Sequence, residues 1–313
     1  MNNNASIVLL AGIAATMLFS CKKSDNTPVS YAGISAVFTQ QALQPKTVLI
    51  DAGNANSFYG NSGTRYVFAA NSFQTAAGVP VTGQVTLQVS EYLQKGDMIF
   101  SKMLPISNNE PLLSGGELNV TATQGGQPLY LRPGMTFQAN MPQSGTAPAG
   151  LALFFGQKTD SNSAAGNVNW IPAAIDSTVG GVVIGADTIG IISDSLNECN
   201  ADAFMSSPDF QNFNVTVNIT GVAITSSTVI YGYTLYDTYK GVWPLGMIGS
   251  YSNGVFNEKH VPNIPVHFVV FTVINGQFYG GTLGSITPAT GSNYTVTLNP
   301  MDAGVFKTAV NAL

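Results

Sequence analysis

Hydrophobic and polar residues alternate strictly in several parts of this chain. In the segment 84–92, positions 85, 87 and 89 are Val or Leu, whereas the even positions from 84 to 90 carry Gln, Thr or Ser. The segment 213–219, Phe-Asn-Val-Thr-Val-Asn-Ile, alternates in the same way. A period of two residues is that of a β-strand with one face on a core and one face in water. Both segments are therefore predicted to be half-buried strands.

Short β-prone runs separated by turn signals fill most of the remaining chain. The clearest turn is Asn275-Gly276, which joins the run 266–274 to the run 277–279 and predicts a tight hairpin. Further runs of β-branched and aromatic residues lie at 47–51, 64–69, 117–122, 128–131, 135–139, 151–155, 167–171, 228–233 and 294–298. Many short strands with Gly and Asn turns are typical of β-sandwiches or small barrels, so we expect an all-β fold.

The segment 142–150, Pro-Gln-Ser-Gly-Thr-Ala-Pro-Ala-Gly, has the composition of a linker. A chain of 313 residues is long enough for two domains at about 100–150 residues each. We therefore expect two β-sandwiches in tandem, the first over residues 31–142 and the second over residues 150–313.

Two short helices are predicted at the outer ends of these domains. The first lies within Tyr31–Gln44 and is stopped by Pro45. The second begins after Asp302, a suitable capping residue, and places Phe306, Val310 and Leu313 on one face. Both helices are expected to be peripheral lids on the sandwiches.

The first 21 residues have the layout of an export signal. An apolar, uncharged run over 5–19 ends at Ser20-Cys21, and two lysines follow. The ending Leu18-Phe19-Ser20-Cys21 resembles the lipobox of bacterial lipoproteins, in which the Cys carries the lipid. This predicts a lipoprotein signal peptide over 1–20, lipidation of Cys21 and a polar tether over 21–30. The chain would then be lipid-anchored in the outer membrane, facing either the periplasm or the cell exterior.

The charge content is unusually low. Charged residues make up 9% of the chain, against about 25% in an ordinary soluble domain, and Asn, Gln, Ser, Thr and Gly take their place. This gives a neutral, hydrogen-bonding surface. A net charge of −5 without a basic cluster argues against nucleic acid as a partner. Once Cys21 is lipidated, Cys199 has no cysteine to pair with, so no intrachain disulfide is expected.

Three stretches, 63–73, 78–87 and 113–122, resemble the ZU5-type β-sandwich and are also similar to bacterial envelope lipoproteins that carry this segment. The resemblance covers about residues 47–142 and depends on Gly turns and alternating strands. Modules of the ZU5 type generally bind partners or mediate assembly, so the resemblance implies a binding or structural role. In ZU5-containing proteins a neighbouring module cleaves itself at a His-Phe-Ser site. The matching triplet here, His267-Phe268-Val269, has no nucleophile at Val269, so self-cleavage is not expected.

Residues for catalysis are scarce. The chain has two histidines, His260 and His267, no Gly-x-Ser-x-Gly motif, and no ligand spacing typical of zinc. Cys199 is interpreted as a small buried hydrophobe. A glycosidase would need two carboxylates a few ångströms apart across a sugar, and the sequence does not pair its carboxylates. Those available are Glu91, Asp97, Glu110, Glu117, Glu198 and Asp202. We therefore expect no metal and no cofactor.

An aromatic cluster is the clearest candidate for ligand binding. Tyr231, Tyr233, Tyr236, Tyr239 and Trp243 fall within thirteen residues. Exposed Tyr and Trp rings stack on sugars and anchor protein interfaces, although the same residues also fill cores. The leading hypothesis is a non-catalytic binding or scaffolding module of the cell envelope. The alternatives are a polysaccharide-binding lipoprotein that uses these aromatics, and a carboxylate-based glycoside hydrolase.

Overall fold

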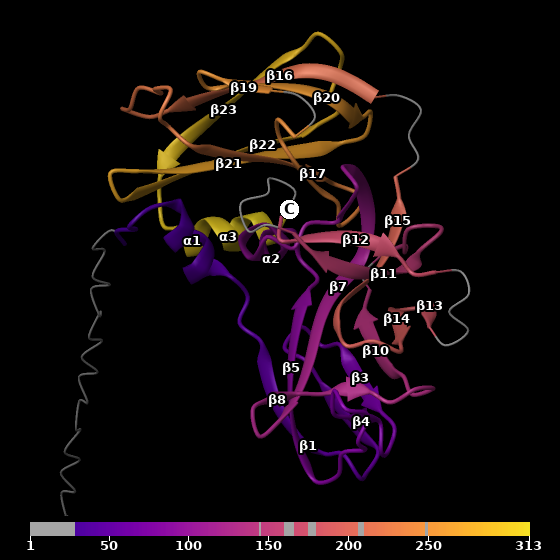
Figure 1. Ribbon diagram of the computed structural model, residues 1–313. Helices are drawn as coiled ribbons and strands as arrows, with labels where there is room; N and C mark the ends of the chain where they lie inside the picture. Colours follow the sequence, from indigo (N-terminus) through magenta and orange to yellow (C-terminus); the bar gives the residue numbers. More distant parts are fainter. Residues whose placement is uncertain (1–28, 144, 160–165, 175–179, 206–209, 248–249) are drawn as a thin grey trace, which may run out of the picture.

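The computed structural model describes residues 29–143, 145–159, 166–174, 180–205, 210–247 and 250–313. Most of these residues lie in β-strands, and three short helices accompany them (Figure 1). The strands form two sandwich-like bodies, one above the other in the view of Figure 1. The expected all-β fold class is confirmed. Cys21, the signal peptide 1–20 and residues 21–28 of the tether lie outside the described residues.

Two sheets packed face to face form the first sandwich. The first sheet has the order β1 (Lys46–Asp51), β5 (Gln84–Tyr92), β7 (Glu110–Gln124), β15 (Asn197–Phe204), β11 (Ala152–Lys158) and β12 (Val168–Pro172). The second has the order β13 (Gly181–Ile184), β14 (Thr188–Ser193), β10 (Phe137–Pro142), β3 (Arg65–Phe68) and β2 (Asn56–Tyr59). Short strands complete it: β6 (Ile106–Ser107) and β8 (Gln127–Pro128) on β7, and β4 (Phe73–Gln74) with β9 (Tyr130–Leu131).

The alternation in 84–92 has the predicted effect. Val85, Leu87 and Val89 of β5 are buried in the first core, where Phe68 and Phe137 of the facing sheet stack 5.5 Å apart. Burial of this apolar face stabilises the sandwich by about 25 cal/mol per Å² of apolar surface.

The expected domain boundary at 142–150 is wrong. Strand β15 pairs with β7 and β14 pairs with β10, so strands after residue 150 complete both sheets of the first sandwich. The segment 142–150 connects β10 in one sheet to β11 in the other. Loops between sheets and linkers between domains are both rich in Pro, Gly and small residues, so composition does not separate them. The first sandwich therefore spans 46–204, and the second begins at residue 210.

The second sandwich is one folded sheet of eight strands. Its order is β18 (Val242–Pro244), β17 (Ile230–Tyr236), β21 (Val266–Ile274), β22 (Gln277–Ile286), β23 (Asn293–Pro300), β16 (Phe210–Ile219), β20 (Val255–Pro262) and β19 (Ser250–Ser252). Strands β16 and β23 are parallel. The ring centroids of Phe213 on β16 and Phe268 on β21 lie 5.5 Å apart across the fold. The hairpin predicted at Asn275-Gly276 is confirmed, because Ile274 pairs with Gln277.

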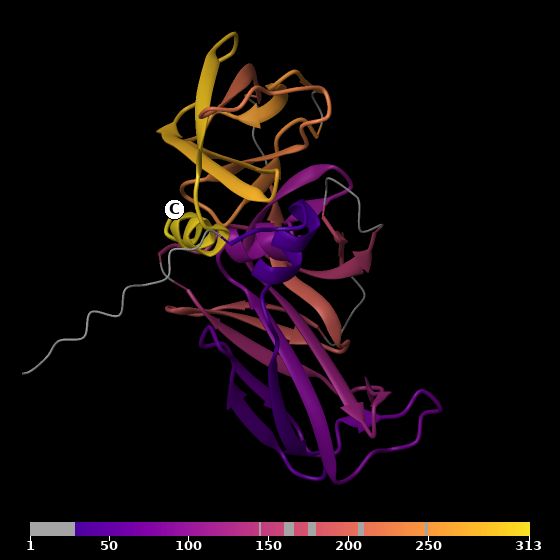
Figure 2. The same cartoon turned by 90° about the vertical axis from the view of Figure 1, so that its left-hand side faces the viewer.

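Three helices lie between the sandwiches, as Figures 1 and 2 show from two sides. They are α1 (Ile34–Gln41), α2 (Lys95–Ser101) and α3 (Ala303–Asn311). The predicted first and last helices are present, and Asp302 caps α3 by accepting from the backbone amides of Gly304 and Val305. The expectation that helices form peripheral lids is wrong, and α2 was not predicted.

The helices give both sandwiches a common core. Phe100 of α2 stacks on Phe271 of β21 at 5.2 Å, and Phe38 of α1 and Phe306 of α3 also pack against Phe271. One continuous cluster of buried side chains runs from α2 into the second sandwich. Since protein interiors are close-packed, the two sandwiches share a continuous interior at the helices.

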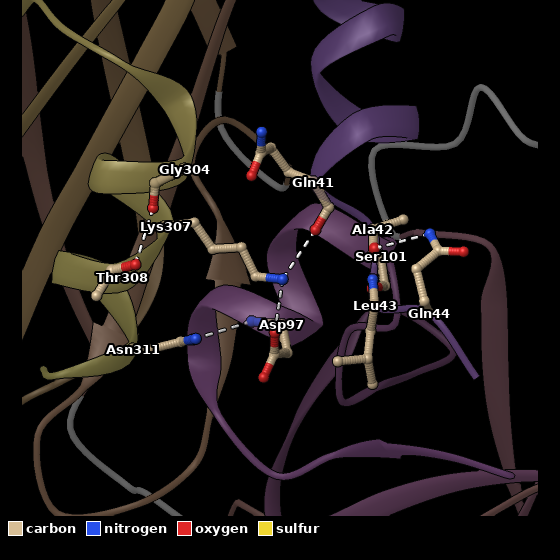
Figure 3. Close-up of polar contacts among 10 residues, drawn as sticks. All are labelled: Gln41, Ala42, Leu43, Gln44, Asp97, Ser101, Gly304, Lys307, Thr308 and Asn311. Carbon is tan, nitrogen blue, oxygen red and sulfur yellow. Dashed lines mark hydrogen bonds and ion pairs between the residues drawn. The ribbon is translucent and has the colours of Figure 1, made fainter. Parts of the chain in front are cut away.

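Polar contacts tie the same helices together (Figure 3). The Lys307 ammonium on α3 lies 2.7 Å from Asp97 Oδ1 on α2 and donates to the Gln41 carbonyl of α1 at 2.8 Å. The Asp97 backbone amide donates to Asn311 Oδ1 at 3.1 Å. Lys307 therefore joins one helix from each of three distant parts of the chain, and we call this layer the helical joint.

Candidate functional site

A cleft of about 730 Å³ opens beside the helical joint, between the two sandwiches. The loop 61–62, the start of α2, the loop after β10, the segment 237–240 and the end of α3 line it. Among its described lining residues, three carry charged side chains, namely Lys95, Asp237 and Lys240. The others are mainly amides, hydroxyls, Pro and Gly, so the cleft is polar.

Both lysines of the cleft bridge the sandwiches. Lys95 Nζ donates to the backbone oxygens of Tyr236 at 2.6 Å and Leu313 at 3.1 Å. Lys240 Nζ donates to the Gly115 carbonyl at 3.3 Å and to Gln143 Oε1 at 3.4 Å. Burial lowers the pKa of both ammonium groups, while nearby Asp237 raises that of Lys95. These contacts hold the cleft walls in place.

Asp237 connects the cleft to the histidine noted in the sequence. Its Oδ1 lies 2.7 Å from His267 Nδ1, and its Oδ2 accepts a hydrogen bond from the Ser285 hydroxyl. In a serine hydrolase the serine hydroxyl contacts the histidine, which takes its proton. Here the Ser285 hydroxyl is directed to the carboxylate instead. The side chain of His260 lies outside the description.

The predicted aromatic binding row is wrong for most of its members. Tyr233, Tyr236 and Trp243 are at most 4% exposed and belong to the common core. Tyr231 is half-buried, with its ring stacked on Phe271 at 5.9 Å.

Tyr239 is the one member of this row that lines the cleft among the described residues. The physical reason lies in the fold. The helical joint covers the face of β17 that carries Tyr231 and Tyr233, whose rings pack on Phe271. Tyr236 and Trp243 lie on the opposite face, which β20 covers inside the second sandwich.

Two candidate carboxylates are brought together by the fold, but inside it. Glu117 of β7 and Asp202 of β15 are fully buried on the face of the sheet away from the first core. Burial raises the pKa of Asp202 to about 8, although hydrogen bonds from Ser114 and Asn200 act to lower it. Burial, and then the neighbouring Asp202, raise the pKa of Glu117. Neither Glu117 oxygen has a hydrogen-bond partner among the described residues. Of this group, Ser114 lines the cleft and the two carboxyl groups do not.

The remaining candidates have structural environments. Glu91 accepts hydrogen bonds from the backbone amides of Ser62 and Thr64, and Asp97 pairs with Lys307. Cys199 is buried in the first core, and burial raises the pKa of its thiol to about 12, so the reactive thiolate is disfavoured. In the described part of the chain, no three His, Cys, Asp or Glu side chains gather as metal ligands.

Sequence reasoning overlooked the lysines that shape the cleft. Lys95 is the first residue of a short helix without an amphipathic pattern, and Lys240 lies in a loop among aromatic residues that are the stronger signal for binding. Isolated lysines carry no local signal, because their carbonyl partners lie far away in the sequence.

Comparisons with known proteins give little guidance. No protein family and no curated protein matches this chain. One solved structure that it is similar to is a pilus-presented adhesin (Cpa), with 8% identity over 83% of this chain and 95% of that chain. The TM-score is 0.15, which is too low for any property of the adhesin to be transferred. Within the described ranges, no helix has the length and apolarity needed to cross a bilayer.

Proposed function

We propose that this chain is a lipid-anchored protein of the bacterial cell envelope that acts as a non-catalytic binding or scaffolding module. The polar cleft at the helical joint carries the proposal. It is large enough for a small ligand or a peptide segment, and its walls are fixed by side-chain bonds between the sandwiches. A pre-formed cleft binds with less loss of conformational entropy than one that must be ordered.

The chemistry of the cleft favours binding over hydrolysis. A glycoside hydrolase presents two carboxyl groups to the sugar. Here the fold brings Glu117 and Asp202 together but encloses them, and the cleft itself holds Asp237 as its acidic side chain among the described residues. Asp237 is occupied by His267 and Ser285.

Site-specific photocrosslinking in cells tests the cleft. The photoreactive residue p-benzoylphenylalanine replaces Tyr239 in the cleft or, as a matched control, Tyr130 on the first sandwich, which is 46% exposed and away from the cleft. We expect a discrete protein or glycan adduct at position 239 and none at 130. Absence of an adduct at 239, or the same adducts at both positions, would contradict the proposal.

The anchor has a separate test. We expect the Cys21→Ala protein to leave the membrane fraction, because a diacyl or triacyl lipid is what would hold the chain there. An unchanged membrane fraction for Cys21→Ala would refute lipidation at this residue. Proteinase added to intact cells then distinguishes a surface-exposed protein from one that faces the periplasm.

A further inference from the structure

The outer face of the second sandwich carries an unusual pattern on two neighbouring parallel strands. Alternate positions from 214 to 220, in β16 and its extension, and from 293 to 299, in β23, face solvent; they are Asn214, Thr216, Asn218, Thr220, Asn293, Thr295, Thr297 and Asn299. All eight are Asn or Thr. We call these eight residues the Asn/Thr face.

The register aligns these residues in ranks across the strands. Asn214 lies opposite Asn293, Thr216 opposite Thr295, and Asn218 opposite Thr297. Neighbouring strands are about 4.8 Å apart and same-face residues about 6.7 Å apart along a strand, so the face is a regular lattice of hydroxyl and amide groups.

Hydrogen bonds between the side chains fix part of this lattice. Asn257 Nδ2 on β20 donates to Asn214 Oδ1 at 2.9 Å, and Asn214 Nδ2 donates to Asn293 Oδ1 at 2.9 Å. Thr220 Oγ1 donates to Asn299 Oδ1 at 2.9 Å. Side chains that are already ordered lose less entropy when a ligand binds.

The composition of the face selects one class of partner. Nucleic acids and anionic membranes need clustered Lys and Arg, and the eight positions have neither. Protein interfaces are enriched in aromatic residues, Met and Arg, which are also missing from these positions. A neutral polysaccharide presents uncharged hydroxyl groups that both donate and accept, as the Asn and Thr side chains do.

We propose that the Asn/Thr face binds a neutral polysaccharide. The face lies on the side of the second sandwich away from the helical joint (Figure 1), so it is a surface separate from the cleft. The inference therefore does not depend on the cleft function. It also differs from the aromatic hypothesis, because none of Tyr231, Tyr233, Tyr236, Tyr239 and Trp243 belongs to this face.

Pull-down with insoluble polysaccharides tests the proposal. The full-length protein in detergent is mixed with cellulose, β-1,3-glucan, α-1,4-glucan or chitin, and the bound fraction is measured. We expect retention on at least one of them and a loss of at least tenfold for the Thr295→Lys/Thr297→Lys protein. Thr47→Lys, at an exposed position of β1 in the first sandwich, is the matched control and should bind like the wild type. Tyr239→Ala should also bind normally, which separates this surface from the cleft.

Four results would overturn the proposal. The first is no retention of the wild type on any of the four polysaccharides. The second is unchanged retention of a Thr295→Lys/Thr297→Lys protein that melts like the wild type. The third is loss of wild-type retention in about 1 M NaCl, where charge attraction is screened. The fourth is a concentration-dependent dimer in light scattering that Thr297→Lys abolishes, which would assign the face to a second copy of the chain.

Discussion

The buried carboxyl group of Asp202 gives a prediction that can be worked out quantitatively. Asp202 is fully buried in β15, and burial raises its pKa from 3.8 to about 8. Between pH 5 and pH 8 the unfolded chain ionises this group, whereas the folded protein keeps it protonated. The folded state then binds one more proton, so the free energy of unfolding falls as the pH rises.

The magnitude follows from the size of the shift. One pKa unit corresponds to about 1.4 kcal/mol, so ionisation of this carboxyl group in the unfolded chain removes about 4 kcal/mol of stability between pH 5 and pH 8. Asn has nearly the same shape and does not titrate. The free energy of unfolding of Asp202→Asn, relative to the wild type, should therefore increase by about 3–4 kcal/mol from pH 5 to pH 8.

Urea denaturation at several pH values measures this difference. The buried tryptophans Trp170 and Trp243 report on one sandwich each by fluorescence. Glu258, whose pKa burial also raises to about 8, titrates in both proteins and cancels in the difference. The same comparison in a Glu117→Gln background removes any contribution from Glu117, whose pKa the neighbouring Asp202 also raises. Asp187→Asn, at an exposed position, is the control and should follow the wild type at every pH. If Asp202→Asn and the wild type differ by the same free energy at pH 5 and pH 8, the reasoning is refuted.

Three further substitutions test the joint and the core through urea midpoints. Lys307→Ala should lower the free energy of unfolding by about 1–3 kcal/mol, because it leaves the enclosed Asp97 carboxylate without its cation. Lys158 has a side chain that is 79% exposed, so Lys158→Ala should lower it by only about a few tenths of a kcal/mol. Equal losses for the two lysine variants would show that the joint gains nothing from its ion pair. Trp243→Ala should lower the free energy of unfolding by about 3–5 kcal/mol, as expected of a core residue. A near-zero change would show that Trp243 lies at the surface. Asp302→Ala should cost about 1 kcal/mol through the lost cap of α3, with Asp302→Ser close to the wild type.

Local signals in the sequence predicted local structure well. The alternation around Val85 and around Val215 identified two strands and their buried faces, because the side-chain period of a strand is built into the chain. Asn275-Gly276 and Asp302 identified a hairpin and a helix cap for the same reason. Each of these features depends on residues a few positions apart.

Features that depend on distant partners were missed. The segment 142–150 has the composition of a linker, yet the pairing of β15 with β7 makes it a loop inside one sandwich. Helix α2 carries Lys95 and Asp97, which are satisfied by groups more than a hundred residues away, so it shows no amphipathic pattern. The aromatic residues around β17 could line a surface or fill a core, and Phe38 of α1, which covers Tyr231, comes from near the start of the described chain.

The Asn/Thr face shows where functional information is held in such a chain. The alternation in 213–219 was used for its apolar positions, which the fold requires to be buried. Its polar positions need only carry side chains that tolerate water, and Lys or Glu would do so as well as Asn or Thr. The low charge content of the whole chain accounts for the absence of Lys and Glu, but not for the restriction of all eight positions on two strands, about 80 residues apart in sequence, to Asn and Thr. The parallel register of the two strands appears only in the structure. The sequence therefore identifies the residues of this surface but does not show that they lie side by side. Folding does not impose this restriction, whereas binding of a ligand with regular, uncharged chemistry would impose it.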